Sequence, residues 1–159
     1  MLLSPNLTQL DLTGPYEVLA RLPGAHVHLV AAAREPVRSE HGLAIVPTAT
    51  FDEIGAADVV FVPGGHGQIA ATADAATMAW LRGLRARWIT SACTGALLLG
   101  AAGLLRGYRA ATHWAFLEYD PAPAYPGHPR TAPAELVASI RAQVAARYAE
   151  RRALLTSLT

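Results

Sequence analysis

The sequence predicts an α/β fold with a doubly wound, mainly parallel sheet and helices on both of its faces. Two observations support this prediction. Short apolar runs typical of strands alternate with stretches of helical periodicity between residues 26 and 103. The 159 residues are 52% hydrophobic and 16% charged, which is sufficient for one substantial core and leaves little room for a second.

Apolar runs predict four strands in chain order. The run Asp58–Val62 is closed by Pro63-Gly64-Gly65 and is typical of a strand buried on both faces of a parallel sheet. The opening residues Met1–Pro5 are expected to be at most the tail of an earlier strand. The four strands are placed at residues 26–30, 43–46, 58–62 and 87–91.

Helices are predicted before the first of these strands, after the third and the fourth, and near the end of the chain. Asp74 is a suitable N-cap for one helix, and Gly103 is a suitable C-terminal cap for the next. The helices are placed at residues 16–21, 74–87, 94–103 and 134–155.

We expect an α/β domain at residues 1–119 and a Pro-rich linker at 120–133, where five of fourteen residues are proline. Residues 134–159 are expected to form a C-terminal helix that packs on the same domain. Its arginines are spaced like those of a solvated face, so a docked helix is favoured over a DNA-binding one.

Charge and residue usage exclude several classes of function. Thirteen arginines against twelve acidic residues leave a net charge of +1, which recruits neither nucleic acid nor a membrane surface. The absence of lysine excludes Schiff-base chemistry and a Walker A loop. One cysteine cannot form an intrachain disulfide, and the six histidines lack metal-ligand spacing, so no metal or cofactor is expected. No signal peptide or membrane-spanning run is visible, which predicts a cytoplasmic protein.

Cys93 is the strongest candidate for a reactive group, because it lies where a predicted strand changes into a predicted helix. The small neighbours Ala92 and Gly95 suit the tight turn of a nucleophile elbow. The helix N-terminus favours a thiolate, so a lowered thiol pKa is expected. The amides of Thr94, Gly64 and Gly65 are expected to face a developing anion. The alternative is an inert, buried cysteine.

Two further residues are candidates for the same site. Asp11 is a single carboxylate among apolar neighbours and is suited to donate a proton beside a thiolate, although a capping role is the alternative. His113 follows a short predicted strand and is placed at the pocket, with a hydrogen-bonded core imidazole as its alternative.

Several segments together resemble the ThiJ/PfpI superfamily, and within it the isonitrile hydratase branch. They occur in family order at residues 9–15, 62–65, 90–96, 98–105 and 108–114. The resemblance implies a flavodoxin-like fold of the class I glutamine amidotransferase type and a homodimer. It also implies that Cys93 is the nucleophile and that Asp11 and Thr94 are required with it.

The chain departs from the family pattern at three places. Family members begin with a full first strand, of which only the last residues are expected here. Ala111 stands where the family usually has threonine. After Tyr119 a block of strands and a helix is expected to be missing, since Asp120 onwards resembles the family's C-terminal tail.

These observations favour a cysteine-dependent lyase that adds water to a small isonitrile and yields an N-substituted formamide. A second hypothesis is a domain that senses a ligand without turnover, like those in AraC-type transcription regulators. A third is a degenerate family member that folds poorly, because removing paired strands exposes sheet edges.

Overall fold

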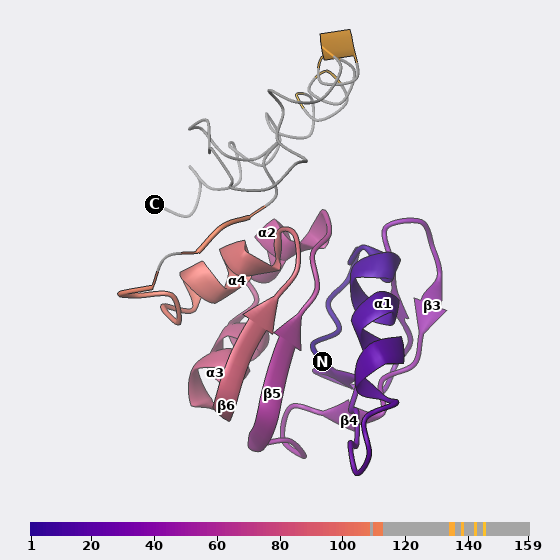
Figure 1. Cartoon of the computed structure of the whole chain (residues 1–159), viewed down its shortest axis with the longest axis vertical. Helices are drawn as coiled ribbons and strands as arrows, with labels where there is room; N and C mark the ends of the chain where they lie inside the picture. The colour runs from indigo at the N-terminus through magenta and orange to yellow at the C-terminus, as the bar shows by residue number, and fades with distance from the viewer. Residues whose placement is uncertain (109, 113–133, 136–137, 139–141, 143–144, 146–159) are drawn as a thin grey trace. The chain divides into compact units, whose positions relative to one another are not determined.

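The structure is a computed structural model, and it describes residues 1–108, 110–112, 134–135, 138, 142 and 145 (Figure 1). The chain divides into two compact units, Met1–Ala111 and Thr112–Thr159. The described residues at 134, 135, 138, 142 and 145 are helical. The predicted linker at 120–133, the predicted break after Tyr119 and His113 lie outside the described residues, and the predicted domain boundaries stay predictions.

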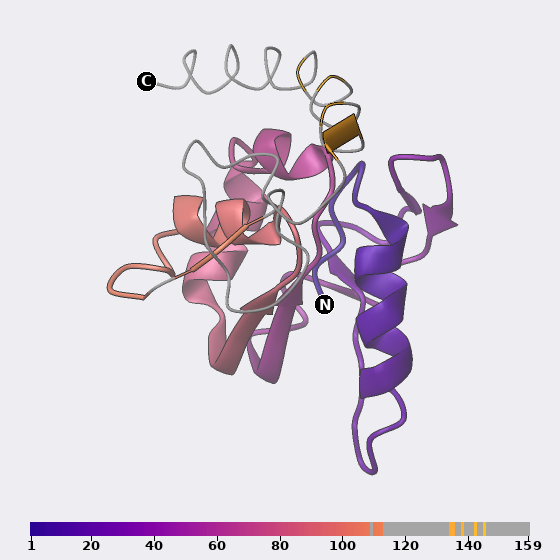
Figure 2. The same cartoon turned by 45° about the horizontal axis from the view of Figure 1, so that its top comes forward.

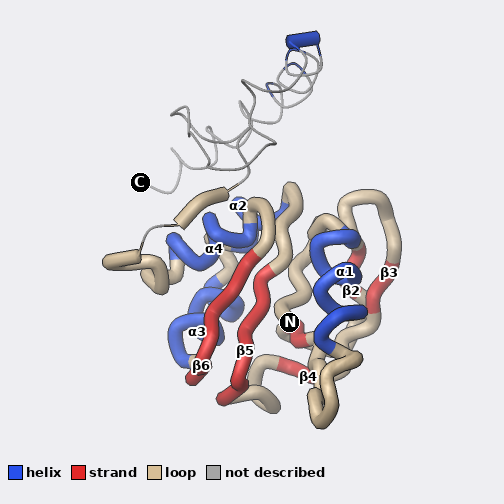
Figure 3. The backbone as a smooth tube through the Cα atoms, in the orientation of Figure 1, coloured by secondary structure: helices blue, strands red, loops and turns tan. Residues whose placement is uncertain are grey.

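The first unit contains both helices and strands, as Figure 3 shows. In chain order its elements are α1 (Gln9–Leu19), β1 (Val30–Ala31), β2 (Val37–Arg38), β3 (Ala44–Ile45), β4 (Ala49–Thr50), β5 (Ala56–Val62), α2 (Gly67–Ala71), α3 (Ala75–Gly83), β6 (Arg85–Ser91) and α4 (Gly95–Ala101). Within the described residues, no helix is both long and apolar enough to cross a membrane.

The main sheet consists of two parallel pairs joined by the opening residues of the chain. β5 pairs with β6, and β1 pairs with β4. Between the pairs, the Leu2 N–H donates to the Phe61 carbonyl at 2.9 Å, and the Leu3 N–H donates to the Val30 carbonyl at 2.8 Å. The order is therefore β4, β1, Met1–Leu3, β5, β6. This order confirms the predicted doubly wound α/β fold and places the predicted strand tail at its centre.

Side chains that alternate along the strands form two cores, one on each face of the sheet. Leu2 and Val62 belong to a cluster with residues of α2, α3 and α4, which include Leu81 and Leu98. Leu3 belongs to a second cluster, which includes Leu12 of α1. Figure 1 and Figure 2 show α1 on the opposite side of the β5–β6 pair from α3 and α4.

Several predicted elements have different bounds in the structure. Residues 26–30 contribute only β1 at their end, and the helix expected at 16–21 is α1, which begins at Gln9. Residues 43–46 contribute β3, which pairs antiparallel with β2 outside the main sheet.

The expectation that residues 58–62 are buried on both faces is wrong for their amino half. Val62 is fully buried, whereas Val59 is 40% exposed. The reason is that Met1–Leu3 lies beside the carboxyl half of β5, where Phe61 accepts its hydrogen bond, and not beside the amino half.

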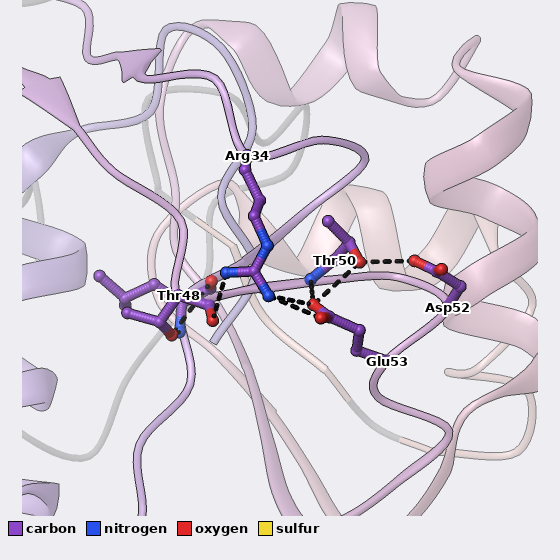
Figure 4. A network of polar contacts seen from close by, with 6 residues as sticks. Arg34, Thr48, Thr50, Asp52 and Glu53 are labelled. Atoms are coloured by element: carbon purple, nitrogen blue, oxygen red, sulfur yellow. Dashed lines mark hydrogen bonds and ion pairs between the residues drawn. The ribbon is translucent and has the colours of Figure 1, made fainter.

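A surface network holds the loop after β1 against β4 (Figure 4). The Arg34 guanidinium donates to both carboxylate oxygens of Glu53, at 2.6 and 2.8 Å, and to the Thr48 carbonyl at 3.1 Å. Hydrogen bonds from Thr50 and Arg34 lower the pKa of Glu53. Because all these side chains are exposed, the network fixes the loop geometry more than it stabilises the fold.

The predicted cap of α3 is present, and its removal has a calculable effect. Asp74 accepts a hydrogen bond from the Thr77 N–H at 2.9 Å, which lowers the pKa of the carboxyl. We expect Asp74→Ala to lower the free energy of unfolding by about 1 kcal/mol in chemical denaturation at pH 7. Asp74→Asn retains the acceptor and is the control. The charged carboxylate's contribution is lost as the pH falls below 3.8, so the stability difference between the parent and Asp74→Ala should shrink in acid. The difference between Asp74→Asn and Asp74→Ala should not depend on pH, and a parent difference that is equally constant would contradict the assigned cap.

Candidate active site

Cys93 lies in a strained turn between β6 and α4. Its φ is 49°, in the left-handed region that side chains other than glycine rarely adopt. The turn is held by the Ala92 N–H, which donates to the Val62 carbonyl at 3.1 Å, and by the Gly95 N–H, which donates to the Ala92 carbonyl at 2.9 Å. This geometry is that of a nucleophile elbow, in which a sharp strand-to-helix turn presents one side chain.

Two glycines allow this turn to approach its neighbours closely. A Cβ on Gly95 would collide with the Val62 carbonyl oxygen and lie 2.9 Å from that of Pro63. A Cβ on Gly64 would lie 2.5 Å from the Cys93 Cβ, 2.6 Å from Asp11 Oδ2 and 2.9 Å from the Thr94 nitrogen. Asp11 of α1 and Cys93 and Thr94 of the turn between β6 and α4 therefore converge at Gly64.

Thr94 joins the two loops that carry the site. It is fully buried, and its hydroxyl accepts from the Gly65 N–H at 2.9 Å and donates to the Gly65 carbonyl at 3.0 Å. The Gly65 amide, which was expected to face an anion, thus donates to Thr94. Gly65 also has a φ of 138° and contacts the backbone of residues 6–8 so closely that no Cβ fits. Its role in this structure is to hold Thr94 in place.

Asp11 and Cys93 interact electrostatically. The pKa of the Cys93 thiol is raised above its ordinary value of 9.0, first by burial and next by the charge of Asp11. Hydrogen bonds from Thr94 lower the thiol's pKa but do not outweigh these causes. The expected low pKa is therefore a wrong prediction for this arrangement, because burial and a carboxylate oppose the helix N-terminus.

The environment of Asp11 fits a role in proton transfer. Its Oδ2 is buried and has no nitrogen or oxygen donor among the described residues. The thiol is its neighbour and hydrogen-bonding partner. A thiol beside a carboxylate is suited to combined nucleophilic and acid–base chemistry.

Sequence reasoning missed the residues that support the two loops. The buried amide of Gln68 donates to the Pro63 carbonyl at 2.7 Å and to Ser4 Oγ at 3.0 Å. The Thr8 N–H donates to the Gly64 carbonyl at 2.8 Å, and its hydroxyl donates to Glu40 at 3.0 Å. Glu40 in turn lies 3.4 Å from His66, the residue after Gly65. The contacts of Gln68 with Ser4, of Thr8 with Gly64 and Glu40, and of Glu40 with His66 have no local sequence signature, since each joins segments far apart in the chain.

The structure thus brings together Asp11, Gly64, Gly65, Cys93 and Thr94, five of the six predicted site residues; the sixth, His113, lies outside the described residues. No group of three side chains suited to a metal ion occurs within the part of the chain that the structure describes.

Comparisons with known proteins extend these observations. The family model described as the DJ-1/PfpI family matches residues 1–128. Isonitrile hydratase of Pseudomonas putida is 51% identical over 122 residues, which cover 76% of this chain and 54% of that protein. The crystal structure of a ThiJ/PfpI family protein from Pseudomonas syringae is 34% identical with a TM-score of 0.84, covering 97% of this chain and 88% of that one.

A third relative is a regulator. The HTH-type transcriptional regulator GbdR of Pseudomonas aeruginosa is 33% identical over 120 residues, which cover 71% of this chain and 33% of that protein. The chain therefore spans about half the length of the similar hydratase and a third of the similar regulator.

The close approach at Gly64 predicts a sharp response to one methyl group. We expect Gly64→Ala to lower the free energy of unfolding by about 1–3 kcal/mol, because the added Cβ overlaps three neighbours. It is also expected to change the rate at which Cys93 is alkylated. Gly83→Ala is the matched control, since a Cβ there meets nothing within 4 Å. Equal effects of the two variants in thermal unfolding would contradict the packing described above.

The raised thiol pKa predicts how alkylation depends on pH. The alkylation rate, followed by intact mass, is expected to keep rising above pH 9.0. Asp11→Asn removes the neighbouring charge and should lower the thiol's pKa, so that the rate at pH 8 increases by about three- to tenfold. Glu17→Gln, an exposed change on the same helix, should leave the profile unchanged. A profile for Asp11→Asn that coincides with the parent's would show that the carboxylate does not act on the thiol.

Proposed function

The chain belongs to the DJ-1/PfpI family, and from this premise we propose that it is a cysteine-dependent lyase of the isonitrile hydratase type. It adds water to a small isonitrile, R–N≡C, and releases an N-substituted formamide. The observation that carries the proposal is the cluster of Asp11, Cys93 and Thr94 around Gly64. The 51% identity to isonitrile hydratase of Pseudomonas putida supports the same reaction class.

In the first step Cys93 adds to the isonitrile. Its sulfur bonds to the terminal carbon, and the thiol proton passes through the Asp11 carboxylate to that same carbon. The product is a thioimidate, R–N=CH–S, attached to the enzyme. The raised pKa of the thiol suits this step, since a protonated Cys93 beside Asp11 supplies both the nucleophile and the proton.

In the second step water releases the product. Asp11 accepts a proton from a water molecule as the water oxygen bonds to the thioimidate carbon, and then passes that proton to the nitrogen. The carbon–sulfur bond of this adduct breaks as Asp11 transfers the proton of the new hydroxyl group to the Cys93 sulfur, and the formamide R–NH–CHO leaves. Thr94 keeps the turn of Cys93 fixed against Gly65, and its backbone N–H lies beside the reacting centre.

Three further parts of the proposal rest on family resemblance and composition. We expect a homodimer, a cytoplasmic location and a small-molecule substrate, without a nucleic-acid or membrane partner. The near-neutral net charge of +1 agrees with the expected absence of a nucleic-acid or membrane partner.

The second candidate function is a ligand-sensing domain without turnover. The similarity to GbdR over a third of that regulator's length favours it. Such a domain would use the same site residues to bind a small molecule, and replacement of Cys93 would leave binding intact.

The decisive experiment incubates the protein with a small alkyl isonitrile and measures formamide by NMR. The parent is expected to produce formamide, and Cys93→Ala should reduce the rate to background. Asp11→Asn should reduce it by about 100-fold or more, because general acid–base catalysis contributes at least that much. Glu17→Gln is the control.

Formamide production that survives Cys93→Ala would overturn the mechanism. Saturable isonitrile binding without turnover, unchanged in Cys93→Ala, would favour the sensing domain.

A further inference from the structure

Thr8 and Asp11, at the start of α1, have the spacing of a capping box but do not form one. In a capping box the first residue's hydroxyl accepts from a backbone N–H of the first turn, and an acidic side chain three residues later accepts from the first residue's N–H. Thr8 is the N-cap residue and makes no side-chain cap hydrogen bond, and Asp11 is the acidic residue of the first turn. The groups that would close the box are therefore available to other partners.

Both donors of Thr8 are used on segments far from it in the sequence. Its N–H donates to the Gly64 carbonyl at 2.8 Å, and its hydroxyl donates to Glu40 Oε1 at 3.0 Å. Because the Thr8 N–H is taken, it does not pair with the Asp11 carboxylate. Asp11 Oδ2 is buried without a nitrogen or oxygen donor among the described residues, and its neighbour is the Cys93 thiol. The unformed cap thus leaves this carboxylate to the thiol.

Glu40 presents a fixed acceptor to Thr8. It lies in the turn between β2 and β3, a hairpin beside α1 (Figure 3), and its N–H donates to the Leu7 carbonyl at 3.0 Å. Its side chain is only 13% exposed, and Oε2 lies 3.4 Å from His66 Nε2. Oε1, which accepts from Thr8, also lies 3.7 Å from Nε2 of the exposed His41. With both oxygens in contact, the carboxylate keeps one orientation.

We propose that Glu40 is a positioning residue for the pair of Asp11 and Cys93. By holding the Thr8 hydroxyl, it keeps the first turn of α1 against the loop after β5 and prevents Thr8 from capping that turn. The Asp11 carboxylate therefore stays beside the thiol. The inference rests on the proposed function for the reaction that it serves, since Asp11 moves the protons there.

Loss of the hydrogen bond between Thr8 and Glu40 should act like a partial loss of Asp11. The freed hydroxyl can accept from the first turn of α1, and the carboxylate then spends part of its time away from the thiol. The charge of Asp11 raises the pKa of Cys93, so its displacement speeds alkylation. In Glu40→Ala and in Thr8→Val the alkylation rate at pH 8 should increase by about two- to fivefold, less than in Asp11→Asn.

Conservative variants distinguish this bond from a loss of charge or of packing. Glu40→Gln keeps an acceptor for the Thr8 hydroxyl, and Thr8→Ser keeps the donor, so both should retain the parent's alkylation rate. Glu35→Ala, an exposed change in the segment before β2, is the matched control for Glu40→Ala and should also leave the rate unchanged.

A double-mutant cycle tests whether Glu40 acts through Asp11. If it does, Glu40→Ala adds nothing to the alkylation rate once Asp11→Asn is present, whereas a general loosening of the site speeds alkylation in both backgrounds. With an alkyl isonitrile, Glu40→Ala should lower kcat by about tenfold and leave KM unchanged, because Asp11 transfers protons and does not hold the substrate. Glu40→Gln should recover the parent's kcat.

Three results would each overturn the proposal: a parent-like rate in Glu40→Ala, an equal increase in Glu40→Gln, or an increase that persists in Asp11→Asn. If Glu40→Ala does not fold, as judged by circular dichroism, the comparison of Thr8→Val with Thr8→Ser tests the same hydrogen bond. Alkylation requires no isonitrile, so a parent without turnover would refute the proposed function and leave the outcome of the cycle standing.

Discussion

The candidate site depends on the pair of hydrogen bonds between the Thr94 hydroxyl and the backbone of Gly65. They join the loop after β5 to the turn after β6, and the left-handed conformation of Cys93 persists because both sides of the turn are held. Because Gly64 has no Cβ, Asp11 of α1 can approach Cys93 closely. Thr8 and Gln68 also fix the loop after β5, because the Thr8 N–H donates to the Gly64 carbonyl and the Gln68 amide donates to the Pro63 carbonyl.

This close packing determines the protonation state of the site. A helix N-terminus alone would favour a thiolate, but here burial and the Asp11 carboxylate raise the pKa of Cys93 above 9.0. The thiol therefore holds its proton more firmly than an exposed cysteine does. A protonated thiol beside a carboxylate suits an addition in which one carbon receives both a nucleophile and a proton. It suits less well a reaction that requires a permanent thiolate.

Local patterns predicted the strands at β5 and β6, the cap at Asp74 and the turn at Cys93, because each depends on neighbouring residues. The apolar neighbours of Asp11 made it a candidate proton donor for Cys93, and the family resemblance supported the same pairing. The direction of the Cys93 pKa, the partner of the Gly65 amide and the part played by Glu40 could not be predicted, since they arise where distant segments meet. The exposure of Val59 likewise depends on which part of β5 is covered.

The placement of Met1–Leu3 also bears on how the fold comes apart. Among the described residues, backbone hydrogen bonds connect the sheet's two parallel pairs through this short segment, which inserts Leu2 into one core and Leu3 into the other. Both apolar clusters contain residues of both strand pairs, Val30 and Val62 in one and Ala31 and Phe61 in the other, so the pairs share their cores. Loss of the Leu2 or the Leu3 side chain would therefore weaken one face of the whole sheet and lower the stability of a single cooperative unit, and would not release one strand pair from the other.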